Sequence, residues 1–369
     1  MPEIDLALRV LPADHQVFFA RPGIQYRLYR EVTEQKVVVP DLPALDLADG
    51  VPLDRQDRVM SRIHRARKLR GWHRSGRIAD EPSRDLNDYD DVASGIRDAQ
   101  FRGVVDGYFS KAKRGDMVLV VPSAFSDPAF IGEFAEDGDQ YASFRAPSVY
   151  GDDPLVGRRV EWLAKIPKRE LASDILDIVA KPNAFVLLPR SVRAGLYDLA
   201  YSAYSIEDSF TARLEVTDET FSSFDDLLIQ AFINFVAANT QAVSEGKEVA
   251  SFERGAFMES GDFTPDLRAE IHSPGFLSIS SRKVTPLVAV VMLAAAIHIG
   301  PAAFAAAQDG TLRIGSASAP AGDACVAEVR EQAIRQIQLL GLDRWAVACE
   351  KAKRAAQHTG LNGPTHVRP

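Results

Sequence analysis

The chain has 369 residues, of which 46% are hydrophobic, 25% charged and 8% aromatic, and its formal net charge is -8. This composition is typical of a globular protein and excludes a disordered chain, a collagen and a disulfide-stapled mini-protein. The negative net charge also excludes a polycation that coats nucleic acid along its whole surface. The length favours two domains.

The compartment is inferred from the cysteines and from the N-terminus. Cys325 and Cys349 are too few for a secreted disulfide framework and do not have zinc-ligand spacing, so we expect buried, inert thiols. The first residues include Pro2, Glu3 and Asp5, with neither a basic segment nor an apolar one after it. We therefore expect no secretory signal and a cytoplasmic location.

The region up to about residue 190 is predicted to contain many short strands. Apolar, β-branched or aromatic runs lie at residues 15–20, 36–39, 117–121, 130–134, 159–163 and 184–188. Residues 26–34 have helical spacing. Short strands with few long helices favour a curved sheet or a partly closed barrel.

Charge is unevenly distributed within this region. Residues 55–77 include nine basic side chains and one acid, and residues 80–91 are acidic. One interpretation is a solvated helix face that its acidic neighbour neutralises. The other is a phosphate-binding surface, because the arginine fork binds oxyanions through two hydrogen bonds. The candidate phosphate-binding residues are Arg65, Arg67, Lys68 and Arg70.

The second half has more helical periodicity. Residues 224–242 are predicted to form an amphipathic helix capped near Ser222 or Ser223. Residues 324–341 form another, ended by Gly341, and residues 345–356 a third. A strand is expected over residues 203–216, turns over 261–281, and a frayed tail from Gly360 onward.

Residues 284–307 carry no formal charge, over a length that could cross a bilayer. The segment is rich in alanine, contains His298 and is interrupted by Gly300-Pro301. We favour a buried core helix. The alternative is a membrane span, with Arg282 and Lys283 at one end.

Short motifs in the first half occur in a characteristic order. They are Phe18-Phe19-Ala20-Arg21-Pro22-Gly23, an apolar strand at 37–39, Gly115-Asp116 before a strand that ends at Pro122, Gly132-Glu133, and Arg158-Arg159-x-x-Trp162-Leu163 followed by Pro167-Lys168-Arg169. In this order the first half resembles the N-terminal domain of Mrr-type bacterial restriction proteins, in the PUA-like and EVE-like group. The chain departs from the family at Gly157 (usually histidine), at Pro40-Asp41 (usually tryptophan), and in an insertion over residues 51–91.

The resemblance implies a domain that recognises bases, often modified ones, or related nucleotide ligands. A base taken out of its stack needs an aromatic or guanidinium platform and polar groups at its edge. The candidate ligand-binding residues are Trp162, Arg158, Arg159, Tyr141 and Arg145, with Tyr150 nearby. Arg158 and Arg159 alternate along a strand, so only one of them can face a given pocket. Trp162 is equally well explained as a core anchor.

A catalytic site is not evident in the sequence. A restriction nuclease would need two acids and a lysine, and the closest match is Glu245-Gly246-Lys247 downstream of Asp225-Asp226. Arg58 to His64 and Arg67 to His73 fit an Arg-x5-His spacing of some ribonucleases, which chance explains in so basic a window. We find no Walker A loop, Rossmann fingerprint, nucleophile elbow, zinc-protease motif or histidine cluster. We assign no catalytic residue, metal or cofactor.

These observations predict an α+β protein with a PUA/EVE-like domain over residues 1–190 and a mainly helical effector or oligomerisation domain over residues 191–369. The predicted function is a nucleic-acid or nucleotide sensor of a bacterial restriction or antiphage defence system. Its expected partners are nucleic acid or a nucleotide, a protein of the same system and a second copy of the chain. The alternatives are a diverged metal-dependent nuclease and a membrane-associated effector anchored by residues 284–307.

Overall fold

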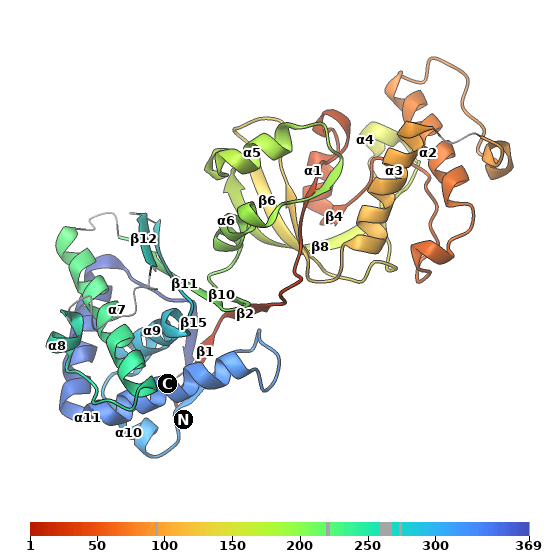
Figure 1. Cartoon of the computed structure of the whole chain (residues 1–369). Coiled ribbons are helices and arrows are strands. Elements are labelled where there is room, and N and C mark those ends of the chain that lie inside the picture. Colours follow the sequence, from red (N-terminus) through yellow and green to blue (C-terminus); the bar gives the residue numbers. More distant parts are fainter. Residues whose placement is uncertain (93–94, 219–221, 258–267, 273–274, 369) are drawn as a thin grey trace. The chain divides into compact units, whose positions relative to one another are not determined.

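The computed structural model describes residues 1–92, 95–218, 222–257, 268–272 and 275–368, which form two compact units (Figure 1). One unit is Asp14–Ala200, and the other combines Met1–Ala13 with Tyr201–Pro369. The α+β class is confirmed. The boundary predicted at residue 190 lies instead after α6 (Arg190–Ala200). Residues 1–13 belong to the other unit because β1 (Glu3–Leu6) and β2 (Leu8–Leu11) pair with its strands.

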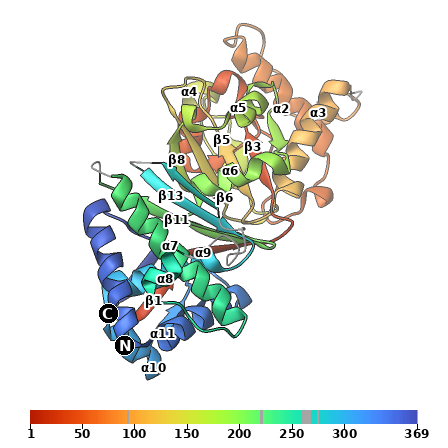
Figure 2. The same cartoon turned by 60° about the vertical axis from the view of Figure 1, so that its left-hand side comes forward.

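The Asp14–Ala200 unit is built on a seven-stranded sheet with the order β4-β8-β6-β5-β3-β9, and β7 pairs with β8. The strands are β3 (Val17–Ala20), β4 (Val37–Val38), β5 (Met117–Val120), β6 (Pro128–Phe134), β7 (Ala142–Phe144), β8 (Leu155–Pro167) and β9 (Phe185–Leu187). The short strands predicted in this region are confirmed apart from their bounds. The register of β6 and β8 shifts between Ile131 and Gly132, where Leu163 is an extra residue of β8, and the sheet curls into a half-barrel (Figure 2).

The helices of this unit surround the sheet and include an inserted group. They are α1 (Tyr29–Gln35), α2 (Val59–Arg74), α3 (Ile96–Asp106), α4 (Pro147–Tyr150), α5 (Ser173–Ala180) and α6, with 3-10 turns η1 (Ile24–Tyr26), η2 (Leu53–Arg55), η3 (Leu86–Tyr89) and η5 (Lys168–Glu170). The π-helical turn η4 (Gly107–Lys111) directly continues α3. The insertion predicted over residues 51–91 forms η2, α2 and η3. Its apolar side chains, such as Ile63, join the core of the unit, and α2 contacts α3.

The second unit contains two sheets as well as helices, so the prediction of a mainly helical domain was too narrow. One sheet has the order β12-β13-β11-β10-β2 and the other β14-β1-β15. The strands are β10 (Ala203–Ile206), β11 (Ser209–Val216), β12 (Arg268–His272), β13 (Gly275–Ser281), β14 (Arg313–Gly315) and β15 (Thr365–Arg368). The strand predicted over residues 203–216 is a hairpin. The tail predicted to fray from Gly360 was wrong over β15, because β1 supplies backbone partners for it.

The helices of the second unit are α7 (Ser223–Ser244), α8 (Phe252–Ala256), α9 (Thr285–Ala294), α10 (Ala302–Gln308) and α11 (Ala324–Thr359), with the π-helical turn η6 (Ala295–Ile299). The predicted cap of α7 is confirmed, since the Ser222 side chain accepts a hydrogen bond from the Asp225 N–H. At Gly341 the backbone is not helical, with a φ of 76° and a ψ of 163°, so α11 consists of two helical segments that meet at a kink there. The helix end predicted at Gly341 is therefore confirmed.

Residues 284–307 form α9, η6 and α10. Every residue of α9 is buried, as the core-helix interpretation predicts. The segment from Thr285 to Ile299 is apolar enough to cross a membrane only together with Ala302–Gln308, and these two parts are bent by 118°. Helix α7 also has the length and hydropathy of a span, but 61% of its apolar window is buried in the unit.

Candidate ligand-binding pocket

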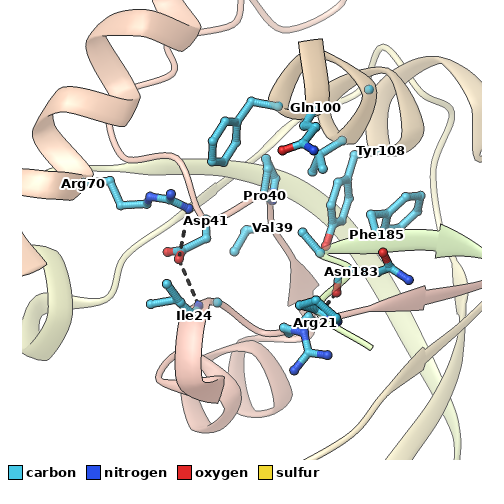
Figure 3. Close-up of a pocket in the computed structure, with 16 residues that line it drawn as sticks. Arg21, Ile24, Val39, Pro40, Asp41, Arg70, Gln100, Tyr108, Asn183 and Phe185 are labelled. Carbon is cyan, nitrogen blue, oxygen red and sulfur yellow. Dashed lines mark hydrogen bonds and ion pairs between the residues drawn. The ribbon is translucent and has the colours of Figure 1, made fainter. Parts of the chain in front are cut away.

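A cavity of about 440 Å³ lies in the Asp14–Ala200 unit. Its walls come from the turn after β3, the residues that follow β4, helix α2, the continuous α3–η4 helix and the loop that leads into β9 (Figure 3). Binding sites for small molecules are typically cavities of about 300–1,000 Å³, mostly apolar, with a few polar groups that converge on the ligand. The side chains of this cavity fit that description.

Aromatic rings form one wall. The ring centroids of Tyr108 on η4 and Phe185 on β9 are 4.1 Å apart, and Phe185 stacks in turn on Phe18 at 4.9 Å. Gly107 makes this packing possible, because a Cβ at that position would lie 2.5 Å from the Phe185 ring. Phe101 on α3 adds a further ring to the lining. Such walls suit a planar, aromatic ligand.

The Tyr108 hydroxyl is the most informative polar group. Tyr108 is 1% exposed, and the hydroxyl has no hydrogen-bond partner among the residues that the structure describes. Figure 3 shows it directed into the cavity, toward Asn183. Burial raises its pKa, so the group stays a protonated donor at neutral pH. The hydroxyl is not closed off from the cavity, so an acceptor atom of a bound ligand can pair with it.

Asp41 supplies the negative charge of the lining. Its Oδ2 accepts a hydrogen bond from the Ile24 N–H at 3.0 Å, and its Oδ1 accepts one from the Tyr150 hydroxyl. The Arg27 guanidinium lies 3.6 Å from the same Oδ1. Burial next to this carboxylate raises the pKa of Tyr150. Asp41 is therefore fixed in position by Ile24, which also lines the cavity, and by Tyr150 and Arg27 outside the lining, and it faces the cavity as a hydrogen-bond acceptor.

Two arginines line the cavity, and they differ in how many of their hydrogen-bond donors are already used. Arg21 donates hydrogen bonds to the carbonyls of Val179, Lys181 and Asn183 at 2.5–3.0 Å, so its guanidinium holds the loop before β9. Arg70 lies against the Phe101 ring at 4.6 Å from its centroid. Its closest carboxylate oxygen is Oδ2 of Asp41 at 3.7 Å, which is longer than a hydrogen bond. The donors of Arg70 are therefore available to a ligand.

Two side-chain amides complete the polar set. Gln100 on α3 and Asn183 in the loop before β9 are exposed residues of the lining. Neither amide makes a side-chain hydrogen bond to any residue in the part of the chain that the structure describes. Amides both donate and accept, so they can pair with the edge of a heterocyclic ring.

The two arginines of β8 that were predicted to bind the ligand do not belong to the described lining of the cavity. Arg158 is completely buried and donates to the carbonyls of Tyr108, Ala112 and Glu136. Burial lowers its pKa to about 10, so it remains charged at neutral pH. Arg159 points to the other side of the strand, where its exposed side chain pairs with Glu136 at 2.7 Å. Arg158 is therefore a structural residue, which binds the backbone of η4 and of the residue after it through the Tyr108 and Ala112 carbonyls.

The aromatic candidates also have structural partners. The Trp162 indole N–H donates to the Thr33 carbonyl at 3.0 Å, and its ring packs against Phe130. Tyr141 donates through its hydroxyl to the Val51 carbonyl at 2.8 Å. Arg145 is exposed, and its carbonyl accepts a hydrogen bond from the Gln35 side chain. None of these residues belongs to the described lining of the cavity.

The basic run is divided among several environments. Arg65 is buried and bonded to the Ala44 carbonyl and the Asp46 carboxylate, and Arg67 pairs with Asp98. Lys68 is exposed, and Arg70 lines the cavity. Farther along the run, Arg58 pairs with Asp90 in the acidic stretch, as the neutralised-face interpretation predicts. Of the four candidate phosphate-binding residues, Arg70 is therefore the one in the described lining of the cavity.

Part of the lining could have been found in the sequence. Arg21 and Gly23 belong to the turn motif on which the family resemblance rests. Pro40-Asp41 stand where the resembled family usually has a tryptophan, which this chain lacks. The residues from α3, η4 and the β9 loop had no such signal. Tyr108 in particular lies in a segment for which the sequence pattern predicted no element.

The acids and the lysine of the candidate nuclease site do not come together, because they lie at opposite ends of α7. Glu245 and Lys247 pair with each other at 2.6 Å at the exposed end of α7, and Asp225 serves as the capping partner of Ser222 at its start. Within the part of the chain that the structure describes, no group of three or more His, Cys, Asp or Glu side chains is placed to hold a metal ion. Burial raises the pKa of both thiols to about 12, in line with the expectation of inert cysteines.

Comparison with known proteins identifies no relative of this chain. Neither a protein-family model, nor a curated protein, nor a solved structure matches the chain.

Proposed function

We propose that the Asp14–Ala200 unit recognises a nucleobase-bearing ligand in this cavity and that the second unit couples binding to an effector protein or to self-association. The observation that carries the proposal is the hydroxyl of the buried Tyr108, which points into a cavity with aromatic walls and makes no hydrogen bond to the residues that the structure describes. A base offers a flat face for the rings and an edge with both donors and acceptors.

The remaining polar groups fit the same ligand. Asp41 accepts hydrogen bonds, Tyr108 donates one, and the amides of Gln100 and Asn183 do both. A cavity that presents both donors and acceptors can distinguish one base from another, because the bases differ in the donors and acceptors along their edges. The order of motifs that resembles Mrr-type restriction proteins supports a sensor in a bacterial restriction or antiphage defence system, with a PUA/EVE-like recognition domain and a cytoplasmic location.

Filling the cavity tests this proposal directly. Gly103 on α3 lines the cavity, and a Cβ added there meets no atom within 4 Å, so Gly103→Trp places an indole at the site without a clash at the backbone. We expect the variant to fold, because glycine is unfavourable within a helix. Binding should be lost when the full chain is titrated calorimetrically with the common nucleosides, their 5′-monophosphates and short single strands.

Gly71→Trp is the matched control. Gly71 is also an exposed helical glycine with open space at its Cβ, and it lies on α2 outside the described lining. The control should bind as the unmodified chain does. Equal binding by both tryptophan variants would place the ligand elsewhere, and the absence of binding by the unmodified chain to every compound would refute the proposed function.

Tyr108→Phe should separate binding from stability. Removing a hydroxyl that makes no hydrogen bond to the described residues is expected to leave the free energy of unfolding unchanged or to raise it by up to about 1 kcal/mol. The affinity for the ligand should fall roughly three- to tenfold, the value of one hydrogen bond. Chemical denaturation and calorimetric titration of the same preparations measure the two effects.

Tyr89→Phe is the control for this variant, because the buried Tyr89 hydroxyl donates to the Ser83 carbonyl at 2.8 Å. It should lose about 0.5–1.5 kcal/mol of stability and keep its affinity. If Tyr108→Phe behaved in the same way as Tyr89→Phe, the Tyr108 hydroxyl would have a partner within the protein and no role in binding.

A further inference from the structure

The cavity is asymmetric in its chemistry. Figure 3 shows the Tyr108 and Phe185 rings at one side and the Arg70 guanidinium at the opposite side, with Val39 and Pro40 between them. The first side is aromatic and carries a hydroxyl that makes no hydrogen bond to the described residues, and the second side carries the Arg70 guanidinium with Asp41 beside it. A ligand that satisfies both sides has a planar ring at one end and an anionic group at the other.

Arg70 is positioned to bind an anion. Its guanidinium is held against Phe101 at 4.6 Å, which limits the conformational entropy that binding would cost. Asp41 does not consume its donors, because the 3.7 Å separation exceeds a hydrogen bond and Asp41 already accepts from Ile24 and Tyr150. Arg21 and Arg67, in contrast, are bonded to carbonyls and to Asp98 respectively.

The surroundings of Arg70 hold charges of both signs, with the Asp41 carboxylate 3.7 Å away and two other arginines near enough to interact. Burial lowers the pKa of Arg67, and the nearby charges of Arg70 and Arg97 lower it further. Three guanidinium groups therefore lie close enough to repel one another, while Asp98 neutralises one of them. An added anion at Arg70 would relieve that repulsion.

We infer that Arg70 forms a phosphate subsite and that the ligand is a nucleoside phosphate, with its base against Tyr108 and Phe185 and its phosphate on the Arg70 guanidinium. This inference rests on the proposed function, since it names the second half of the same ligand. The arginine fork matches two phosphate oxygens. The phosphate belongs to a free nucleotide or to a nucleic-acid strand, two sources that carry the same chemistry.

The test compares nucleosides with their 5′-monophosphates. The full chain, Arg70→Gln and Lys68→Gln are titrated calorimetrically with adenosine, guanosine, cytidine and uridine and with the corresponding monophosphates. Lys68 is the matched control because it is an exposed cation on the same helix, outside the described lining. Trinucleotides of the preferred base form a second arm, in which tighter binding than the monophosphate identifies a strand as the source.

The unmodified chain and Lys68→Gln should bind the preferred monophosphate at least about tenfold more tightly than its nucleoside, as a charge-assisted hydrogen bond implies. Arg70→Gln should reduce that ratio to about one while nucleoside affinity changes by less than about twofold. The preference of the unmodified chain should also weaken as salt increases. If Arg70→Gln fails to fold, Arg70→Lys, which keeps the charge but not the fork, should show an intermediate ratio.

A ratio that Arg70→Gln leaves unchanged would overturn the phosphate subsite, as would equal affinity of the unmodified chain for nucleosides and monophosphates. Both outcomes would leave base recognition intact. Failure of the unmodified chain to bind any nucleoside or monophosphate would instead overturn the proposed function together with this inference.

Discussion

Arg158→Met is expected to lower the free energy of unfolding by about 3–5 kcal/mol, because it leaves buried carbonyls without a donor and removes a fully buried side chain. The guanidinium bonds to the carbonyls of Tyr108 and Ala112, at and just after η4. Losing it should therefore also displace Tyr108 and weaken ligand binding. Denaturant unfolding and calorimetric titration measure the two losses.

Arg159→Met is the control at the adjacent position. Its side chain is 62% exposed and makes a surface ion pair with Glu136. Such pairs contribute little, so the change in stability should be within about 0.5 kcal/mol and the affinity should not change. The reverse order, with Arg159→Met impairing binding and Arg158→Met tolerated, would show that the outer face of β8 carries the ligand site.

Gly157→Ala is expected to lower the free energy of unfolding by about 3 kcal/mol, at the upper end of overpacking effects. A Cβ at this position would lie 2.4 Å from the Val38 carbonyl oxygen and 2.5 Å from Val39 Cγ1. The clash pushes β4 away from β8, and Val39 and Pro40 line the cavity. Affinity for the ligand should consequently fall as well. Thermal or denaturant unfolding measures the first effect.

Gly195→Ala is the matched control. Gly195 is exposed on α6 with no atom within 4 Å of an added Cβ, so alanine there should be neutral or stabilise the protein by up to about 1 kcal/mol. A neutral Gly157→Ala would show that β4 and β8 can separate at no cost.

The strands of the first unit were predictable because local sequence determines them. Residues 117–121, for example, are apolar throughout and are bounded by turn formers. A short apolar run with such boundaries is typical of a buried strand. The cap of α7 at Ser222 was predictable for the same reason. The helix end at Gly341 was predictable as well, because glycine adopts the positive φ that ends the first helical segment of α11 at little cost.

Non-local pairing was not predictable. The N-terminal strand β1 pairs with both β14 and β15, more than 300 residues away in the sequence. Alternation along β8 showed that Arg158 and Arg159 face opposite sides but not which side is the interior. The cavity brings together a motif turn, an unpredicted helix and a loop, so its lining depends on tertiary structure. Arg70 was a candidate because arginine in a basic run suits phosphate, and the fold placed it in the lining.

Hydrogen exchange locates the ligand most directly. The full chain is measured by mass spectrometry with and without saturating adenosine, guanosine, cytidine or uridine 5′-monophosphate. Binding in this cavity predicts slower exchange in α3 and η4 and in residues 181–185, with β8 near Trp162 and the helices α7 and α11 unchanged. Protection confined to β8 or to the second unit, or no change in any segment with any of these nucleotides, would contradict base recognition at Tyr108.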